Sequence, residues 1–295
     1  MPQGTFMRTE INENLKTRMN TLNKFRLDGK VAVVTGGAGL LGKKHAEVIA
    51  ESGGIPVLWD INEKTVDACA RDISQSFRTT CLGMKVNITD PESIQSAFNI
   101  LLKKFNGEVD ILINNAANDP KTSTSGSSPG GRLESFTLDA WQKDVAVGLT
   151  GAFLCSQVIG TYMAQEKKGG VILNIASDLG LIAPDQRIYR KDGLKDDEQP
   201  VKPITYSVIK HGIVGLTKYL ATYWADKKIR VNCLSPGGVY TDQSEEFVQK
   251  LTKLIPVGHM ANQDDYKAAV LFLVSPASEY MTGANLVIDG GRTCW

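Results

Sequence analysis

The sequence predicts an α/β fold in which a doubly wound parallel sheet of about seven strands carries helices on both faces. From residue 30 onward, short aliphatic and β-branched runs alternate with segments of helical pattern, which is the order of strands joined by crossover helices. The runs are mostly continuous, as expected for strands buried on both faces. Because no linker or repeat interrupts the pattern, we expect a single domain over residues 26–295 after an N-terminal extension at 1–25.

The expected strands follow one another along this domain. They are Val31–Thr35, Ile55–Trp59, Thr80–Val86, Val109–Asn114, Val171–Ala176, Ile229–Leu234 and Asn285–Ile288. Helices are expected between them wherever a capping residue or a first-turn proline precedes a helical pattern. They are Lys43–Glu51, a helix opened by Asp90 and Pro91, Leu138–Met163 after Thr137, and Asp265–Val274 after Asp264.

Two long segments that follow strands are expected to be loops. Residues 118–132 are rich in Ser, Thr, Gly and Pro, which do not hold regular structure well. Residues 183–203 carry ten charges and three prolines, and loops of that length inside a domain are usually functional. Both segments lie at the carboxyl edge of the sheet, where such folds bind ligands. We expect 183–203 to form a substrate loop, with a solvated loop as the alternative.

Composition and charge exclude several classes of protein. The chain has 33 Lys and Arg against 32 Asp and Glu, and a net charge of +1 gives no basic field for nucleic acid or for an anionic membrane. No apolar run approaches the roughly 18 residues that span a bilayer, and residues 1–25 lack the apolar core of a signal peptide. The five cysteines show no metal-binding spacing. We therefore expect reduced thiols, no metal and a cytoplasmic location.

A glycine-rich turn follows the first expected strand and opens a helix. Residues 35–42 read TGGAGLLG, which lets the backbone approach a pyrophosphate at the positive end of the helix. The second strand ends in Asp60, whose carboxylate can accept from both adenosine ribose hydroxyls and would repel a 2′-phosphate. The cofactor is therefore expected to be NAD rather than NADP. Asn87, at the end of the third strand, is expected either to contact the adenine or to cap its strand.

Tyr206 and Lys210 lie four residues apart on an expected helix, hence on one face. A neighbouring cation favours the phenolate of a tyrosine, which suits the pair to acid/base chemistry near neutral pH. Further motifs accompany the pair: NNAA at 114–117, NIAS at 174–177, SPGG at 235–238, and TG to DGG between 282 and 291. With these motifs the chain resembles the short-chain dehydrogenase/reductase family, in its shorter, single-domain branch with a Rossmann fold, over residues 25–295.

The resemblance implies a role for each matching residue. Tyr206 would be the general acid/base, Lys210 would lower the pKa of Tyr206 and bind the nicotinamide ribose, and Ser177 would hydrogen-bond the reacting oxygen. The implied cofactor contacts are Gly36, Gly39, Leu41, Asp60, Asn87, Ile88, Asn115, Tyr206, Lys210 and Val239. The family also implies a homo-oligomer, either a dimer or a tetramer.

Three features depart from the family pattern. Leu40 stands where shorter members often have a glycine, as in the longer nucleotide-sugar epimerase and dehydratase branch, but only 85 residues follow Lys210, which favours the shorter branch. Ser177 and Tyr206 are 29 residues apart because the charged segment 183–203 is inserted between them. Gly148 replaces the asparagine of the family's proton relay. We expect water to fill the space at Gly148 and an asparagine there to be tolerated.

The sequence thus favours an NAD-dependent oxidoreductase that interconverts a secondary alcohol and a ketone on a sugar, polyol or sugar derivative. Arg187, Arg190 and Lys191 of the insertion are expected to contact this small-molecule substrate. The segments around the insertion and Tyr206 also resemble oxidoreductases encoded with bacterial flagellin or surface-glycan sugar pathways. Two alternatives remain open: a nucleotide-sugar epimerase or dehydratase with tightly bound NAD, and an NAD(H)-sensing binding protein.

Overall fold

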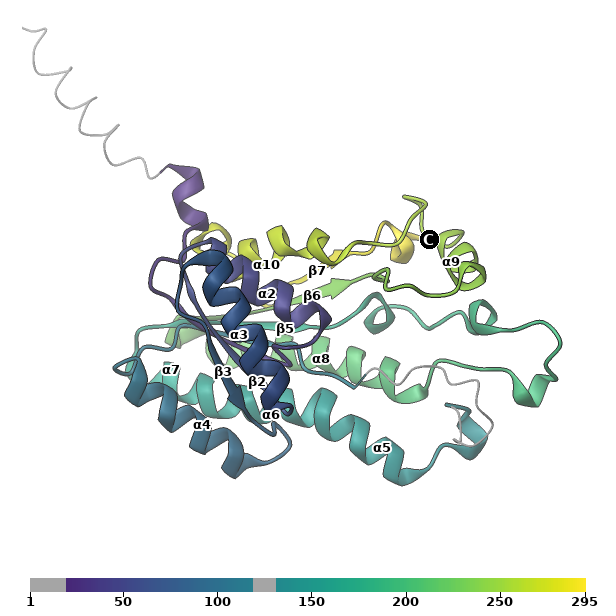
Figure 1. Cartoon of the computed structure of the whole chain (residues 1–295), viewed down its shortest axis with the longest axis horizontal. Helices are drawn as coiled ribbons and strands as arrows, with labels where there is room; N and C mark the ends of the chain where they lie inside the picture. Colours follow the sequence, from purple (N-terminus) through teal and green to yellow (C-terminus); the bar gives the residue numbers. More distant parts are fainter. Residues whose placement is uncertain (1–19, 119–130) are drawn as a thin grey trace, which may run out of the picture.

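A single sheet of seven parallel strands forms the centre of the molecule (Figure 1), in a computed structural model that describes residues 20–118 and 131–295. The strand order is β3-β2-β1-β4-β5-β6-β7, which confirms the predicted doubly wound fold. The strands are β1 (Val31–Thr35), β2 (Ile55–Asp60), β3 (Leu82–Lys85), β4 (Ile111–Asn114), β5 (Gly170–Ile175), β6 (Ile229–Pro236) and β7 (Asn285–Ile288).

Helices cover both faces of this sheet, and each layer encloses its own apolar cluster (Figure 1). One layer contains α2 (Leu40–Glu51), α3 (Glu63–Phe77) and α10 (Lys267–Val274). The other contains α4 (Pro91–Lys104), the run α5 (Leu138–Val145), α6 (Gly151–Cys155) and α7 (Thr161–Glu166), and α8 (Ile204–Tyr223). Successive β1 residues serve opposite layers: Ala32 and Val34 join the first cluster, and Val31 and Val33 join the second. This packing explains why the strand is apolar throughout.

Local signals set the helix boundaries. Asp90 Oδ1 accepts a 3.0 Å hydrogen bond from the backbone N–H of Glu92, and Pro91 occupies the first turn of α4, as predicted. The first crossover helix begins at Leu40 rather than at Lys43, because the glycine turn already ends at Gly39 in extended conformation. The predicted boundary for this helix was therefore three residues late.

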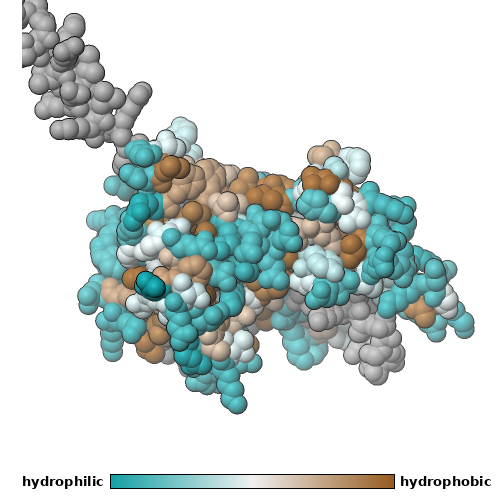
Figure 2. All heavy atoms as spheres, turned by 45° about the horizontal axis from the view of Figure 1, so that its top comes forward, coloured by the Kyte–Doolittle hydropathy of each residue, from teal (hydrophilic) through white to brown (hydrophobic). Residues whose placement is uncertain are grey.

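The long helix predicted over Leu138–Met163 is a run of α5, α6 and α7 that is twice widened into a π turn, at Ala146–Thr150 and at Ser156–Gly160. The run Leu138–Glu166 is long and apolar enough to cross a membrane by length and composition alone. In this fold Cys155, Ile159 and Met163 belong to the apolar cluster beneath the sheet. The face seen in Figure 2 mixes hydrophilic side chains with smaller apolar patches.

The segment at 183–203 packs against the fold at its two ends, whereas residues 191–198 between them are exposed to solvent. It contains 3₁₀ turns at Gln186–Tyr189 and Asp196–Glu198, and Ile188 is buried against α9 (Glu245–Thr252), at the carboxyl edge. Most of the predicted loop at 118–132 and residues 1–19 of the N-terminal extension lie outside the described residues. The described end of that extension is a 3₁₀ turn at Thr21–Phe25.

Candidate active site

A cavity of about 940 Å³ opens at the carboxyl edge of the sheet. It is lined by the ends of β1, β2, β4, β5 and β6 and by parts of α8, α9 and the 183–203 insertion. The residues predicted to contact the cofactor all line it, namely Gly36, Gly39, Leu41, Asp60, Asn87, Ile88, Asn115, Tyr206, Lys210 and Val239. Ser177 lines the same cavity. The fold therefore gathers residues from positions 36 to 239 around one space.

The glycine turn has a shape that only glycine permits at two positions. Gly36 has a φ of +60°, and a Cβ atom there would lie 2.9 Å from Cα of Ala116. A Cβ atom on Gly42 would lie 2.1 Å from the Gly36 carbonyl oxygen. Asn115 donates from Nδ2 to the carbonyls of Thr35 and Gly36, at 3.0 and 3.2 Å, and so fixes the turn. The turn and the unpaired N–H groups of the first turn of α2 fit a pyrophosphate.

Asp60 faces this turn from the end of β2. Its carboxylate accepts hydrogen bonds from the backbone N–H groups of Ala38, at 3.2 Å, and of Asn62, at 3.1 Å. These bonds fix the carboxylate at the cavity wall, in the position expected for contact with an adenosine ribose. Asn87 uses its Oδ1 to accept from both N–H and Oγ1 of Thr89, so it does cap the end of its strand. Its amide N–H groups remain available to an adenine.

The predicted catalytic residues come from two elements. Ser177 follows β5, whereas Tyr206 and Lys210 lie in the first turns of α8. Lys210 is buried, and its ammonium donates a 2.9 Å hydrogen bond to the carbonyl oxygen of Ile175, the last residue of β5. The same ammonium lies 5.8 Å from the centre of the Tyr206 ring. The lysine is therefore fixed to the sheet at a distance from which its charge favours the phenolate of Tyr206.

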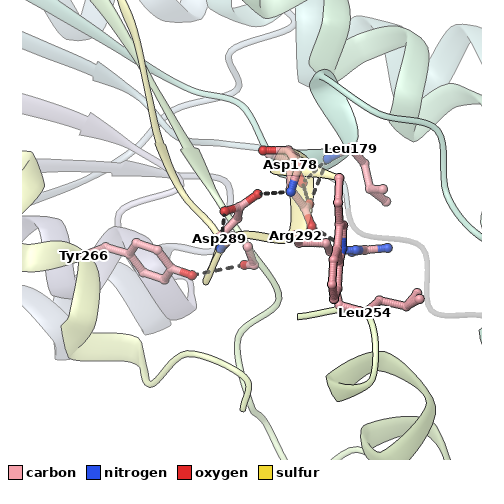
Figure 3. Close-up of polar contacts among 11 residues, drawn as sticks. Asp178, Leu179, Leu254, Tyr266, Asp289 and Arg292 are labelled. Atoms are coloured by element: carbon pink, nitrogen blue, oxygen red, sulfur yellow. Dashed lines mark hydrogen bonds and ion pairs between the residues drawn. The ribbon is translucent and has the colours of Figure 1, made fainter. Parts of the chain in front are cut away.

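Ser177 is part of a buried charged cluster that the sequence analysis missed. Its hydroxyl donates a 2.7 Å hydrogen bond to Oδ1 of Asp178, and Oδ2 of Asp178 accepts from Nη1 of Arg292, also at 2.7 Å. The side chains of Asp178 and Arg292 are only 4% and 7% exposed, so this ion pair is shielded from solvent. Figure 3 shows Arg292 reaching Asp178 from the C-terminal segment. Asp178 and Arg292 are 114 residues apart, so no local pattern signals the pair.

The space expected beside Gly148 does not exist. Gly148 is buried in the first π turn, and a Cβ atom there would lie 2.7 Å from Cγ2 of Ile209, the residue before Lys210. The isoleucine side chain occupies the volume that an asparagine would need. An asparagine at this position would therefore require Ile209 to move, which the sequence did not indicate.

The insertion forms one wall of the cavity with α9. Ile188 packs with Leu251 and Met260, and the ring of Tyr189 lies 5.6 Å from that of Phe247. Arg190 and Lys191 line the cavity, as do Tyr189 and Lys202. Arg187 does not line it. Its guanidinium pairs with Asp185, and its side chain is 85% exposed.

The remaining candidate groups are the potential metal ligands and the cysteines. In residues 20–118 and 131–295, no cluster of three His, Cys, Asp or Glu side chains is arranged to bind a metal. The five cysteines are free thiols, as predicted. Burial raises the pKa of Cys155 to about 12 and that of Cys233 to about 11, so both stay protonated at neutral pH.

Comparison with known proteins agrees with this geometry. The family model for short chain dehydrogenases matches residues 30–189, and the model described as enoyl-(acyl carrier protein) reductase matches residues 198–293. The chain is 34% identical to D-threitol dehydrogenase of Mycolicibacterium smegmatis over 91% of its length and 95% of that protein. It is 35% identical to NAD-dependent glycerol dehydrogenase of Listeria innocua over 91% of its length and 96% of that protein.

Solved structures share the whole fold. A short chain dehydrogenase from Leptospira borgpetersenii with bound NAD⁺ is 34% identical, with a TM-score of 0.75 over 92% of this chain and 95% of that one. A gluconate 5-dehydrogenase from Burkholderia cenocepacia, in complex with NADP and tartrate, is 26% identical, with a TM-score of 0.79 over 94% of this chain and 100% of that one. The chain is therefore an oxidoreductase that interconverts alcohols and ketones, and it belongs to the short-chain dehydrogenase/reductase family.

Proposed function

We propose that this enzyme oxidises and reduces, with NAD, a secondary alcohol and the corresponding ketone on a sugar, polyol or sugar derivative. The observation that carries the proposal is the convergence of Ser177, Tyr206 and Lys210 with Asp60 on one cavity. Ser177, Tyr206 and Lys210 supply proton chemistry, and Asp60 selects the dinucleotide. The substrate class draws support from the relatives named for threitol and glycerol.

Each catalytic side chain has a defined task in this proposal. Bound NAD supplies the hydride acceptor of the reaction. The Tyr206 phenolate takes the hydroxyl proton during oxidation and returns it during reduction. Lys210 stabilises that phenolate by its charge. The Ser177 hydroxyl, which donates to Asp178 in this structure, would turn its proton to the oxygen of the reacting carbon when substrate is bound.

The choice of NAD over NADP follows from the charge at Asp60. Its carboxylate is held by backbone N–H groups and would lie against a 2′-phosphate, which it repels. Among the described residues that line the cavity, the arginines are Arg190 and Arg292, and both belong to the substrate end. A 2′-phosphate would thus find no guanidinium close to Asp60.

The substrate end of the cavity is polar enough for a hydroxylated molecule. Arg190 and Lys191 supply hydrogen-bond donors from the insertion, while Asp242 and Glu246, just before and within α9, supply acceptors. Arg187 has no place in this proposed substrate site, because its side chain is directed to Asp185 and to solvent. A sugar or polyol, which offers both donors and acceptors, matches such walls better than an apolar ring system.

The assembly and location belong to the same proposal. Tyr219 and Tyr223 stack on the outer face of α8, with ring centres 5.7 Å apart and each residue 62% exposed, which suits a contact with a second subunit. We place the enzyme in the cytoplasm as a homo-oligomer. A small molecule, rather than a nucleic acid or a membrane, is its partner.

A substrate screen tests the proposal. Purified enzyme is incubated with NAD and a panel of polyols, sugars, sugar acids and sugar phosphates, and NADH formation is followed by absorbance. We expect oxidation of at least one hydroxylated compound, with a smaller rate when NADP replaces NAD. Silence across the panel in both directions, combined with NAD released on denaturation, would favour an epimerase or dehydratase with tightly held cofactor.

A further inference from the structure

A second lysine lies against the catalytic tyrosine. The ammonium of Lys202 is 3.9 Å from the centre of the Tyr206 ring, closer than the ammonium of Lys210 at 5.8 Å. Lys202 belongs to the insertion and precedes α8, whereas Lys210 lies within the helix. Tyr206 is therefore approached by two cations from two different segments.

The backbone of Lys202 is held in place by the insertion itself. Gln186 accepts a 2.9 Å hydrogen bond from the Lys202 backbone N–H and donates a 3.2 Å bond to the Lys202 carbonyl. Pro203, directly after it, is the N-cap of α8 with a φ of −61°. These restraints fix the position of the Lys202 backbone, from which its side chain extends, before any substrate binds.

A second set of hydrogen bonds, made by Gln199, holds the middle of the insertion together. The carboxamide of Gln199 is buried and bonds to the backbone of Lys191 in both directions, at 2.8 and 3.0 Å, and to the Leu194 carbonyl at 2.8 Å. Arg132 also donates to the Asp196 carbonyl at 2.8 Å. These hydrogen bonds restrain the insertion, and its C-terminal end holds Lys202 over the Tyr206 ring.

Among the described residues, Lys202 and Lys210 are the cations that lie against the Tyr206 ring, and acidic groups stand nearby. Asp144 on α5 accepts a 2.6 Å hydrogen bond from Thr205, and Asp178 is neutralised by Arg292. The other charged groups that line the cavity near the insertion and α9 are Arg190, Lys191, Asp242 and Glu246. A cation over the face of a phenol stabilises the phenolate more than the neutral ring, because the negative charge extends into the ring.

We propose that Lys202 is a positioning residue that acts through Tyr206, by stabilising its phenolate together with Lys210. This inference rests on the proposed role of Tyr206 as the acid/base. In oxidation the Tyr206 phenolate oxygen would take the hydroxyl proton as the carbonyl forms, and bound NAD would be the acceptor of the hydride from the carbinol carbon. Lys202 keeps a larger fraction of Tyr206 ionised near neutral pH. The insertion thereby extends the pH range of alcohol oxidation to lower pH.

The test compares pH profiles of alcohol oxidation for wild type, Lys202→Met and Lys202→Arg. A cation within about 4–6 Å lowers an acid's pKa by roughly one unit or more. Lys202→Met should therefore shift the midpoint of the kcat profile up by about one pH unit, with a roughly tenfold loss of kcat below the midpoint and recovery above it. The KM for the alcohol should stay the same. Lys202→Arg should keep the midpoint close to that of wild type.

A spectroscopic titration and a control variant distinguish an effect on Tyr206 from an effect on substrate binding. The ultraviolet difference spectrum of tyrosinate, taken against Tyr206→Phe with NAD bound, reports the ionisation of Tyr206 without turnover and should show the same shift. Lys195→Met serves as the control, because Lys195 is an exposed lysine of the same insertion that does not line the cavity. An unshifted midpoint in Lys202→Met, or a raised KM with an unshifted midpoint, would overturn the inference and leave Lys202 as a substrate contact or a surface charge. Wild-type turnover by Tyr206→Phe would instead overturn the proposed function.

Discussion

Ile209 fills the position beside Gly148 that a larger residue would need: a Cβ atom on Gly148 would lie 2.7 Å from Cγ2 of Ile209. Both residues are buried, and Ile209 directly precedes Lys210 on α8. The two residues therefore pack as one unit, in which a glycine on the π turn leaves room for an isoleucine that directly precedes Lys210, the proposed catalytic lysine. Gly148 lacks the side-chain amide of the family's proton relay, and Ile209 fills the space that a larger side chain at this position would need.

The first prediction concerns this pair. Gly148→Asn should destabilise the protein by about 1–3 kcal/mol through overpacking and should lower kcat by displacing Lys210. Ile209→Ala alone should cost about 2–5 kcal/mol because it leaves a cavity. The double variant should be more stable than the sum of the two costs implies, as measured by chemical denaturation. Costs that add to within about 0.5 kcal/mol would show that the two sites are independent.

A second prediction concerns the ion pair behind Ser177. Arg292→Met leaves the buried Asp178 carboxylate without its cation, which should cost about 3–5 kcal/mol of stability. Arg187→Met is a matched control: it removes an arginine from the solvent-exposed pair with Asp185 and should leave the stability close to that of wild type. Chemical denaturation of both variants gives the comparison. Equal costs would mean that the Asp178 pair is not shielded as the structure indicates.

The third prediction is a pH dependence that arises from His45. Its ring is fully buried in α2, and burial lowers its pKa to about 4, against a smaller opposing contribution from Asn115. The unfolded chain takes up this proton near pH 6.5, whereas the folded chain does not. The contribution of His45 to stability should therefore fall by about 1.4 kcal/mol for each pH unit from about 6.5 down to about 4, and that contribution should level off below pH 4.

Two variants identify the source of that slope. His45→Leu removes the buried imidazole, so the unfolding free energy should depend less on pH between about 4 and 6.5. His259→Leu removes an exposed imidazole and should keep the wild-type slope. An unchanged slope in His45→Leu would assign the acid sensitivity to other groups.

The fourth prediction concerns cofactor choice. Asp60→Ala should reduce the preference for NAD over NADP by at least about tenfold, or 1.4 kcal/mol, because it removes the acceptor for the ribose hydroxyls and the repulsion of a 2′-phosphate. Glu63→Ala, which removes a nearby acid that does not line the cavity, should leave the preference intact. The preference is measured as the ratio of kcat/KM with NAD to kcat/KM with NADP. Equal use of NAD and NADP by the wild type would contradict the role of Asp60.

The sequence predicted the parts of this molecule that depend on local pattern. The bounds of β1 and β7 agree with the predicted strands, whereas the strand predicted at Thr80–Val86 is shortened to Leu82–Lys85. Strand ends differ because hydrogen bonding to neighbours, which the chain's own hydrophobicity does not reveal, decides where pairing stops. The residues predicted to contact the cofactor all line one cavity, and they could be predicted because the spacing between the glycines and Asp60 follows from backbone geometry.

Contacts between distant segments were not predictable in the same way. The pairing of Asp178 with Arg292 and the approach of Lys202 to Tyr206 depend on tertiary structure. Gly148 was noticed because it departs from a motif, but its neighbour Ile209 was not, since helical pattern alone does not show which residues of two helices meet. Arg187 and Arg190 looked equivalent in the sequence. The 3₁₀ turn at Gln186–Tyr189 separates them, so that Arg190 lines the cavity and Arg187 does not.

The central claim, that Tyr206 is the acid/base of an NAD-dependent alcohol oxidation, is tested most directly by Tyr206→Phe. Removing the phenolic oxygen should lower kcat for alcohol oxidation by about 10²–10⁴-fold, while NADH binding, followed by its fluorescence, should stay close to that of wild type. Turnover by Tyr206→Phe at the wild-type rate, with the same cofactor affinity, would contradict the account.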